Sequence, residues 1–337
     1  MVLKKIISGF FALFALCLFL SACGRKQPIS QSGFYFDTVI SVTLYDSSKT
    51  KQLEHCFELA KLYEHAFSSK IKDSDISKIN RAAGKPVRVG EETVELIEKG
   101  LYYSKLSNGK FDLTVGKLTE LWDFHADTPK LPDAAAVANA IRTIDYRNVI
   151  INGTEVTLTD PNAALDLGGI AKGYIADKLK QYLLSQGITS GLINLGGNVL
   201  TIGEKEDGSA YTIGIQKPFD KSGSPTATVS IKDLSVVTSG VYERYFEQDG
   251  VRYHHILDIS NGYPYQNELL GVSVICANSA DGDGLSTTCF ALGLEKGMEL
   301  IESLEHTEAI FITSDQKLHP SSGIGTDIPM KRMGGDE

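Results

Sequence analysis

Asp283 and Thr287 are the residues whose types and spacing most clearly permit chemistry. They lie four residues apart at the predicted start of a helix, so both side-chain oxygens share one helix face. Carboxylate, hydroxyl and carbonyl oxygens are hard ligands that suit Mg²⁺, which completes its shell with phosphate and water. Asp283 could equally cap the helix, where its charge is favourable. The spacing therefore leaves a metal site and ordinary capping both open.

A glycine-rich turn at 168–173 is a second candidate. Asp166 belongs to a predicted strand over 163–167, and Lys172 follows six residues later at the start of a predicted helix. Backbone N–H groups at such a helix start can bind an anionic ligand. The glycine spacing matches neither a Walker A loop nor a GxGxxG dinucleotide fingerprint. A ligand site and a tight turn with an exposed lysine are both compatible with this pattern.

Two neighbouring histidines, His254 and His255, lie near the end of a predicted hairpin. Its strands, 242–246 and 251–257, flank a turn signal at 248–250. Successive side chains on a strand point to opposite faces, so the two rings cannot form one metal pair. Each histidine is therefore either a hydrogen-bonded structural residue or a candidate base.

These residues need a scaffold of strands with helices inserted between them. The glycine turns at 168–173 and 282–284 are each predicted to follow a strand and precede a helix, which makes a duplicated unit conceivable. Runs of strands with inserted helices favour an α+β fold. The elements predicted from periodicity and cap signals are strand 34–45, helices 53–67 and 92–106, helix 133–144 capped by Asp133, strands 147–151, 154–159 and 163–167, and strand 271–277.

The composition limits the classes of partner. The chain has 337 residues, and 33 Lys and Arg stand against 42 Asp and Glu, for a formal net charge of −9. The sequence has no block of basic residues that could follow a phosphate backbone. This argues against nucleic acid as a partner.

The first residues have the layout of an export signal. Lys4 and Lys5 precede a fifteen-residue apolar stretch and the small residues Ser21 and Ala22. An uncleaved membrane anchor is the alternative, although spanning a bilayer takes ~20 residues. Residues 20–23 resemble the bacterial lipobox, in which the thiol of Cys23 is acylated. We therefore predict a signal peptide over 1–22, a lipid on Cys23 that anchors the exported protein to the extracytoplasmic face of the cell membrane, a tether over 23–33, a folded domain over 34–325 and a flexible tail over 326–337.

Seven ordered motifs together resemble one family, the ApbE-type flavin transferases (FAD:protein FMN transferases). The resemblance covers about residues 34–325. The motifs are 36–42, 110–116 with 121–124, 166–173, 194–198, 238–240, 255–258 and 283–287.

The resemblance implies a fold of two related β/α units packed as one α+β body, with FAD in the cleft between them. It implies that Mg²⁺ is held by the Gly169 carbonyl, Asp283 and Thr287, and that His255 is the catalytic base, with a pKa near neutrality. The FAD contacts that it implies are Lys110, Phe111, Asp112, Asp166, Lys172 and the main chain at Leu257.

This sequence departs from the family pattern in places. Phe36 stands where the family usually has Met, and Asp258-Ile259 and Asn261-Gly262 stand where it usually reads Asp-Pro and Thr-Gly. The first change keeps an apolar surface at this position, and the second leaves His255 in place. Residues 70–80 align only loosely, so no adenine contact is assigned there.

The function implied by the resemblance is transfer of the FMN part of FAD to a threonine hydroxyl of an acceptor protein. Mg²⁺ would neutralise the pyrophosphate, AMP would leave, and FAD would be a substrate. Two alternatives remain: an Mg²⁺-dependent FAD pyrophosphatase, and a flavin-binding lipoprotein without turnover. Residues 222–228 resemble the motif that acceptors carry, but Pro225 occupies the acceptor position. Self-modification there is therefore not expected.

Overall fold

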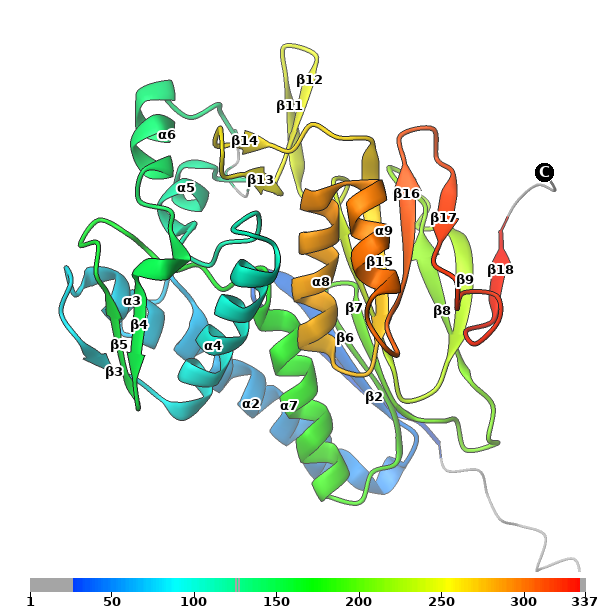
Figure 1. The fold of residues 1–337 in the computed structure, drawn as a ribbon. Coiled ribbons are helices and arrows are strands. Elements are labelled where there is room, and N and C mark those ends of the chain that lie inside the picture. Colours follow the sequence, from blue (N-terminus) through cyan, green and yellow to red (C-terminus); the bar gives the residue numbers. More distant parts are fainter. Residues whose placement is uncertain (1–26, 125, 127, 334–337) are drawn as a thin grey trace, which may run out of the picture.

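The computed structural model describes residues 27–124, 126 and 128–333. The predicted signal peptide and Cys23 lie outside these residues. An eight-stranded, wholly antiparallel sheet forms the centre of the molecule (Figure 1). In sheet order its strands are β1 Ile29–Tyr35, β2 Thr38–Leu44, β6 Ser190–Leu195, β7 Asn198–Gly203, β10 Ser235–Gly240, β15 Leu269–Cys276, β16 Glu308–Thr313 and β17 Leu318–Pro320.

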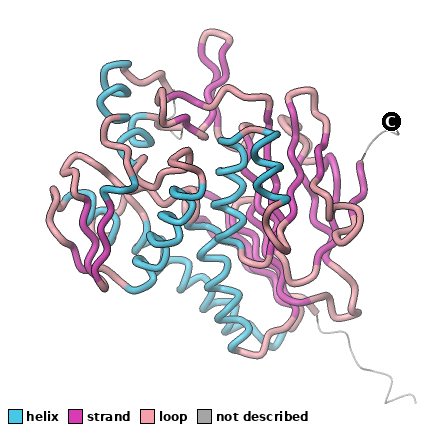
Figure 2. The backbone as a smooth tube through the Cα atoms, viewed as in Figure 1, coloured by secondary structure: helices cyan, strands magenta, loops and turns pink. Residues whose placement is uncertain are grey.

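Helices cover one face of this sheet (Figure 2). Their apolar sides form the main core with alternate residues of the strands, such as Ile40, Val42 and Leu44 of β2, all fully buried. Burying these side chains is the main contribution to stability. The helices on this face are α2 Thr50–Phe67, α7 Ala171–Ser185, α8 Ser279–Leu292 and α9 Leu294–Glu302.

A smaller sheet of three strands packs on the opposite face. Its apolar residues form a second core with the other side of the central strands, so β15 is buried on both faces. A strand covered on both sides reads as a continuous apolar run, as 272–276 does with one serine. The strands are β8 Tyr211–Gln216, β9 Pro225–Ile231 and β18 Met330–Arg332.

The prediction of a flexible tail over 326–337 is wrong for its first part. Strand β18 pairs with β9, with Met330 opposite Val229, and Ile328 is buried. These apolar contacts with the second core order the segment as far as Met333. Residues 334–337 lie outside the described part of the chain.

The predicted tether also ends too late. Residues 29–33 belong to β1, which pairs with β2 along its whole length. The strand predicted over 34–45 is therefore two strands, joined at Phe36 and Asp37, which both have positive φ. The edge strand resembles a linker in sequence because Ser30 and Ser32 face solvent.

The remaining elements lie beside the central sheet and helices. The predicted helices 53–67 and 92–106 are confirmed by α2 and α4, and Asp133 caps α6 through Ala136 N. The strand predicted over 163–167 is wrong, because this segment makes only one bridge, from Ala164 to Val115. The elements are the helices α3 Asp75–Arg81, α4 Glu91–Leu106, α5 Gly116–Leu121 and α6 Ala134–Ile141, the 3-10 turns η1 Ser47–Lys49 and η2 Tyr146–Asn148, and the strands β3 Val87–Arg88, β4 Val149–Asn152, β5 Glu155–Leu158, β11 Tyr245–Gln248, β12 Val251–His254, β13 Leu257–Asp258 and β14 Tyr263–Pro264.

The mixture of helices and antiparallel strands confirms the α+β class. Within the described residues, no helix has both the length and the apolar character needed to span a bilayer.

Candidate active site

The site is built where the first halves of α7 and α8 cross. Gly173 allows the close approach, because a Cβ there would collide with the carbonyl of Ser279. Across this contact each helix supplies an aspartate to the start of the other. Asp283 accepts a hydrogen bond from Gly173 N at 2.6 Å, and Asp177 accepts from Ser279 N and Ala280 N at 2.8 and 2.9 Å.

This arrangement corrects the predicted local structure around Asp283. Helix α8 begins at Ser279, so Asp283 is its fifth residue and caps α7 rather than its own helix. The glycines at 282 and 284 lie inside α8 and do not form a turn. Gly282 lets the helix approach β10, because a Cβ there would lie 2.6 Å from Val237 Cγ2. The prediction that Asp283 caps its own helix is therefore wrong, because it caps α7.

The second oxygen of Asp283 faces a cation. Lys172 Nζ lies 3.9 Å from Asp283 Oδ1, and the carboxylate is buried. Burial raises the pKa of Asp283, whereas Lys172, Gly173 N–H and the Asn198 amide lower it. Asn198 is also buried, and its Oδ1 accepts a hydrogen bond from Ser279 Oγ at 2.5 Å. Its Nδ2 forms no full hydrogen bond within the described residues, although it is near enough to act on Asp283.

Thr287 lies one turn further along α8. Its hydroxyl is 3.0 Å from that of Ser239 on β10, which is itself 2.8 Å from the hydroxyl of Ser286. Asp283 and Thr287 thus share one stretch of helix, as the four-residue spacing predicts.

The glycine turn before α7 is fixed by Asp166. Its Oδ1 accepts from Gly168 N at 2.7 Å, and its Oδ2 accepts from the Thr119 hydroxyl at 2.6 Å. Gly169 lies against Phe111, since a Cβ there would be 3.0 Å from Phe111 Cε2. The turn therefore packs on the loop of the 110–116 motif.

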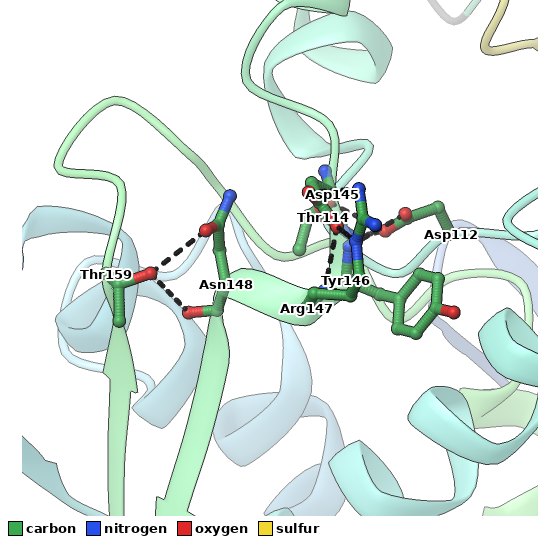
Figure 3. A network of polar contacts seen from close by, with 7 residues as sticks. All are labelled: Asp112, Thr114, Asp145, Tyr146, Arg147, Asn148 and Thr159. Atoms are coloured by element: carbon green, nitrogen blue, oxygen red, sulfur yellow. Dashed lines mark hydrogen bonds and ion pairs between the residues drawn. The ribbon is translucent and has the colours of Figure 1, made fainter.

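Asp112 organises that loop, as Figure 3 shows. Its Oδ1 accepts from the N–H and hydroxyl of Thr114 at 2.8 and 2.6 Å, and its Oδ2 accepts from Tyr146 N at 2.9 Å. Burial raises the pKa of Asp112, and these three donors lower it. Asp145 N in turn donates to the Thr114 hydroxyl. The carboxylate thus holds the loop to η2, and direct binding of FAD by Asp112 stays a prediction.

Lys110 and Leu257 approach the same region from two sides. The Lys110 ammonium lies 5.6 Å from the centroid of the Tyr265 ring, and the Tyr265 hydroxyl donates to the Lys110 carbonyl at 3.3 Å. Tyr265 N donates to the Ile256 carbonyl, next to Leu257, which pairs with Pro264. A polar cavity of about 400 Å³ opens beside Lys110 and Asp258.

The two histidines differ in their surroundings, although β12 ends at His254 and so does not include His255. His254 is buried, and its Nε2 lies 3.1 Å from the Tyr265 carbonyl while its Nδ1 accepts from Ile256 N. Both nitrogens of His254 are therefore used inside the fold, and burial lowers its pKa to about 4.

Among the described residues, one ring nitrogen of His255 has no hydrogen-bond partner. Its Nδ1 lies 3.3 Å from the Arg244 carbonyl, which can only accept, so Nδ1 carries the hydrogen and Nε2 keeps its lone pair. Burial, together with the nearby Arg244, His254 and Lys172, lowers the pKa of His255 to about 3. The expected pKa near neutrality is therefore wrong for the free protein.

Several residues of this region had no role in the predictions. Ser239 and Asn198 lie inside the quoted motifs 238–240 and 194–198, which could have indicated them. Glu243 had no signal of its own. Solvent reaches its side chain, but the protein displaces enough water to raise its pKa to about 7; Asp283 acts in the same direction, while Lys172 opposes it.

Comparison with known proteins identifies the family. Residues 36–311 match the model of the ApbE family. A FAD:protein FMN transferase of Klebsiella pneumoniae (strain 342) is 42% identical over 300 residues, which cover 88% of this chain and 93% of the relative. One of Treponema pallidum (strain Nichols) is 34% identical over 328 residues, which cover 90% and 91%. The crystal structure of the ApbE protein from Thermotoga maritima superposes with a TM-score of 0.81 at 30% identity, covering 88% of this chain and 97% of that one. The chain therefore belongs to the ApbE family.

Proposed function

We propose that this chain transfers the FMN part of FAD to a threonine hydroxyl of an acceptor protein, with Mg²⁺ bound and AMP released. Membership in the ApbE family, with similarity to FAD:protein FMN transferases over 88% and 90% of the chain, makes it a flavin transferase, an enzyme that acts on FAD and a protein. The observation that carries the finer proposal is that Asp283 faces Lys172 where α7 and α8 cross, with Thr287 one turn further along the same helix.

The donor set fits Mg²⁺. Asp283 offers a buried carboxylate with one oxygen not used by Gly173, Thr287 offers a hydroxyl, and the Gly169 carbonyl belongs to an exposed turn. The described residues contain no group of three or more His, Cys, Asp or Glu that could hold a metal. A single carboxylate with neutral oxygens suits an ion that keeps phosphate and water as ligands. When bound, Mg²⁺ would neutralise the FAD pyrophosphate and make AMP a better leaving group.

His255 is proposed to accept the proton of the attacking threonine. Its Nδ1 is oriented by the Arg244 carbonyl, so Nε2 is the atom that would receive the proton. Because its pKa is lowered to about 3, the ring is neutral at physiological pH and its Nε2 carries no proton, although it is a weak base in the free protein. We expect the negative diphosphate of FAD to raise this pKa, since an opposite charge favours the protonated ring. Lys172 and Lys110 would supply positive charge to the same diphosphate.

Attachment to the membrane is proposed as well. Cys23 would be the lipid-bearing first residue of the mature, exported protein. Five residues separate it from Ile29, where β1 begins, so the edge of the sheet would lie within about 20 Å of the lipid. This span is shorter than the predicted tether 23–33 would give.

Intact-mass analysis of an acceptor tests the proposed reaction. A soluble form starting at residue 24 is incubated with FAD, Mg²⁺ and an acceptor that carries one reactive threonine, beside the same acceptor with Thr→Val. We expect a covalent mass increase equal to FMN less water on the first acceptor only, with AMP in equal amount. Free FMN and AMP without modified acceptor would indicate the pyrophosphatase. Intact FAD retained with Mg²⁺ present would indicate a binding protein.

A further inference from the structure

Three hydroxyls and one carbonyl form a chain between α8 and β10. Ser286 Oγ lies 3.1 Å from the Asp283 carbonyl, Ser239 Oγ lies 2.8 Å from Ser286 Oγ, and Thr287 Oγ1 lies 3.0 Å from Ser239 Oγ. Ser286 is fully buried, so its polar hydrogen has only protein partners.

The direction of the hydrogen bonds in this chain follows from counting hydrogens. A carbonyl can only accept, so Ser286 donates its single hydroxyl hydrogen to Asp283. Ser286 can then only accept from Ser239, which uses the one hydrogen that Ser239 has. The remaining contact requires Thr287 to donate to Ser239. The Thr287 hydrogen thus points to β10, and its oxygen lone pairs remain available on the other side.

We infer that Ser239 and Ser286 are positioning residues for the metal site, because they fix Thr287 as a pure acceptor. The inference rests on the proposed function, in which Thr287 and Asp283 bind Mg²⁺. A hydroxyl that turned its hydrogen toward a cation would repel it, whereas one locked into donation elsewhere offers a lone pair. The same residue, Asp283, then supplies one ligand through its carboxylate and anchors the other through its carbonyl.

The fold holds this chain of hydroxyls at a fixed length. Gly282 brings α8 close to β10, and β10 is in register with β15, where Ser239 lies opposite Val272. Beside it, Thr238 and Ser273 form a second hydroxyl pair across the same two strands, 2.7 Å apart. That pair forms no hydrogen bond with Thr287 or Ser286 in the described structure, so it provides a matched control.

The test compares Ser239→Ala, Ser286→Ala and Thr287→Ala with the control Ser273→Ala. Binding of Mn²⁺ alone is measured by loss of the free-ion EPR signal, and the Mg²⁺ concentration for half-maximal FMN transfer is measured in parallel. Thermal melting of each variant separates a metal effect from unfolding. We expect Ser239→Ala to weaken Mn²⁺ binding and raise the half-maximal Mg²⁺ by about tenfold, with the maximal rate within about twofold. Ser286→Ala should act in the same direction. Ser239→Thr keeps the hydroxyl and should bind the metal with the affinity of the parent.

The outcomes separate the inference from the function beneath it. If Thr287→Ala weakens both metal readouts while Ser239→Ala and Ser286→Ala match Ser273→Ala, the positioning role is overturned and the metal site stands. If Thr287→Ala leaves both readouts unchanged, the proposed metal site fails, and the positioning role fails with it. A maximal rate that falls while metal affinity holds would also overturn the inference.

Discussion

The first turns of α7 and α8 are each capped by an aspartate from the other helix, but the two aspartates use their carboxylate oxygens differently. Asp177 uses both carboxylate oxygens on the first N–H groups of α8. Asp283 uses only Oδ2 on α7, and its Oδ1 faces Lys172 instead. A carboxylate with both oxygens bound by backbone N–H groups has little left for a ligand, whereas Asp283 keeps one oxygen that no backbone N–H binds in the described structure. We infer that Asp177 has a structural role in holding α8 against α7, and that Asp283 belongs to the proposed metal site.

The two histidines repeat this difference. Both nitrogens of His254 are bound inside the fold, while Nε2 of His255 has no hydrogen-bond partner in the part of the chain that the structure describes. In both pairs, the residue with a proposed chemical role is the one whose side chain has a polar atom that no backbone group of the described residues hydrogen-bonds. Each prediction below tests that criterion on one pair or one residue.

The largest effect is expected at the histidines. Removing a general base costs about 10² to 10⁴ in rate, so His255→Ala should slow FMN transfer by that factor with FAD binding largely kept. His254→Ala should change the rate much less, because its nitrogens already have partners. Steady-state transfer assays with both variants decide. Equal losses in the two would refute the assignment and make Asp283 the next candidate base.

The lowered pKa of His255 also leads to a prediction for the pH dependence of kcat/KM. The pKa values seen in kcat/KM are those of the free enzyme, and the pKa of His255 is lowered to about 3. Its ring should therefore contribute no acid limb between pH 5 and 8. An acid limb near pH 6.5 that disappears in His255→Ala would contradict the burial of this ring.

Substitution of Asp283 should reduce activity, whereas substitution of Asp177 should reduce stability. Asp283→Asn keeps an acceptor for Gly173 but removes the charge, and the loss of about 3 kcal/mol of transition-state stabilisation would slow turnover about 100-fold. Asp177→Asn should leave the Mg²⁺ dependence unchanged and instead lower the free energy of unfolding by about 1–3 kcal/mol, because one buried N–H loses its acceptor. Chemical denaturation and Mg²⁺ titration of both variants test this. An altered Mg²⁺ requirement in Asp177→Asn would show that the two acids are not distinct.

His254 should make the fold sensitive to acid. Its pKa is lowered to about 4, below the ordinary value of 6.5, so between these values the unfolded chain binds a proton that the native protein does not. Stability therefore falls as the pH drops through this window, by about 3 kcal/mol for this residue. Urea denaturation at pH 7 and pH 5 should show a shallower loss in His254→Gln than in the parent. His255, with the same sign of shift, keeps the remaining slope in that variant.

Sequence patterns predicted the parts of the site that depend on local spacing. Asp283 and Thr287 share a helix, as their spacing predicts. That His254 and His255 have different partners agrees with their predicted separation, but His255 lies just beyond the end of β12. The caps could not be predicted in this way, because Asp177 and Ser279 are 102 residues apart and Asp283 and Gly173 are 110 apart. Local rules place a cap within a few residues of the helix start.

The edge strands β1 and β18 were not predicted from the sequence, for a related reason. The polar residues of β1 match a linker because an edge strand needs apolar residues only where α2 covers it, and β18 is too short to show alternation. The role of Ser239 depends on packing between α8 and β10, which is absent from any local pattern.

The smallest effect is expected at Glu243, which makes no side-chain hydrogen bond to another described residue. Its pKa is raised to about 7, so its charge appears as the pH rises from 6 to 8. Because Lys172 and Asp283 act on this carboxyl, its ionisation makes the region where we propose that the FAD diphosphate binds more negative. The KM for FAD should therefore rise over this range, by a factor of about three for one partly screened like charge. In Glu243→Gln the rise should be absent, and KM should equal the low-pH value of the parent throughout. A KM that rises equally in Glu243→Gln would place the titrating group elsewhere and leave Glu243 as an exposed carboxylate without influence on the site.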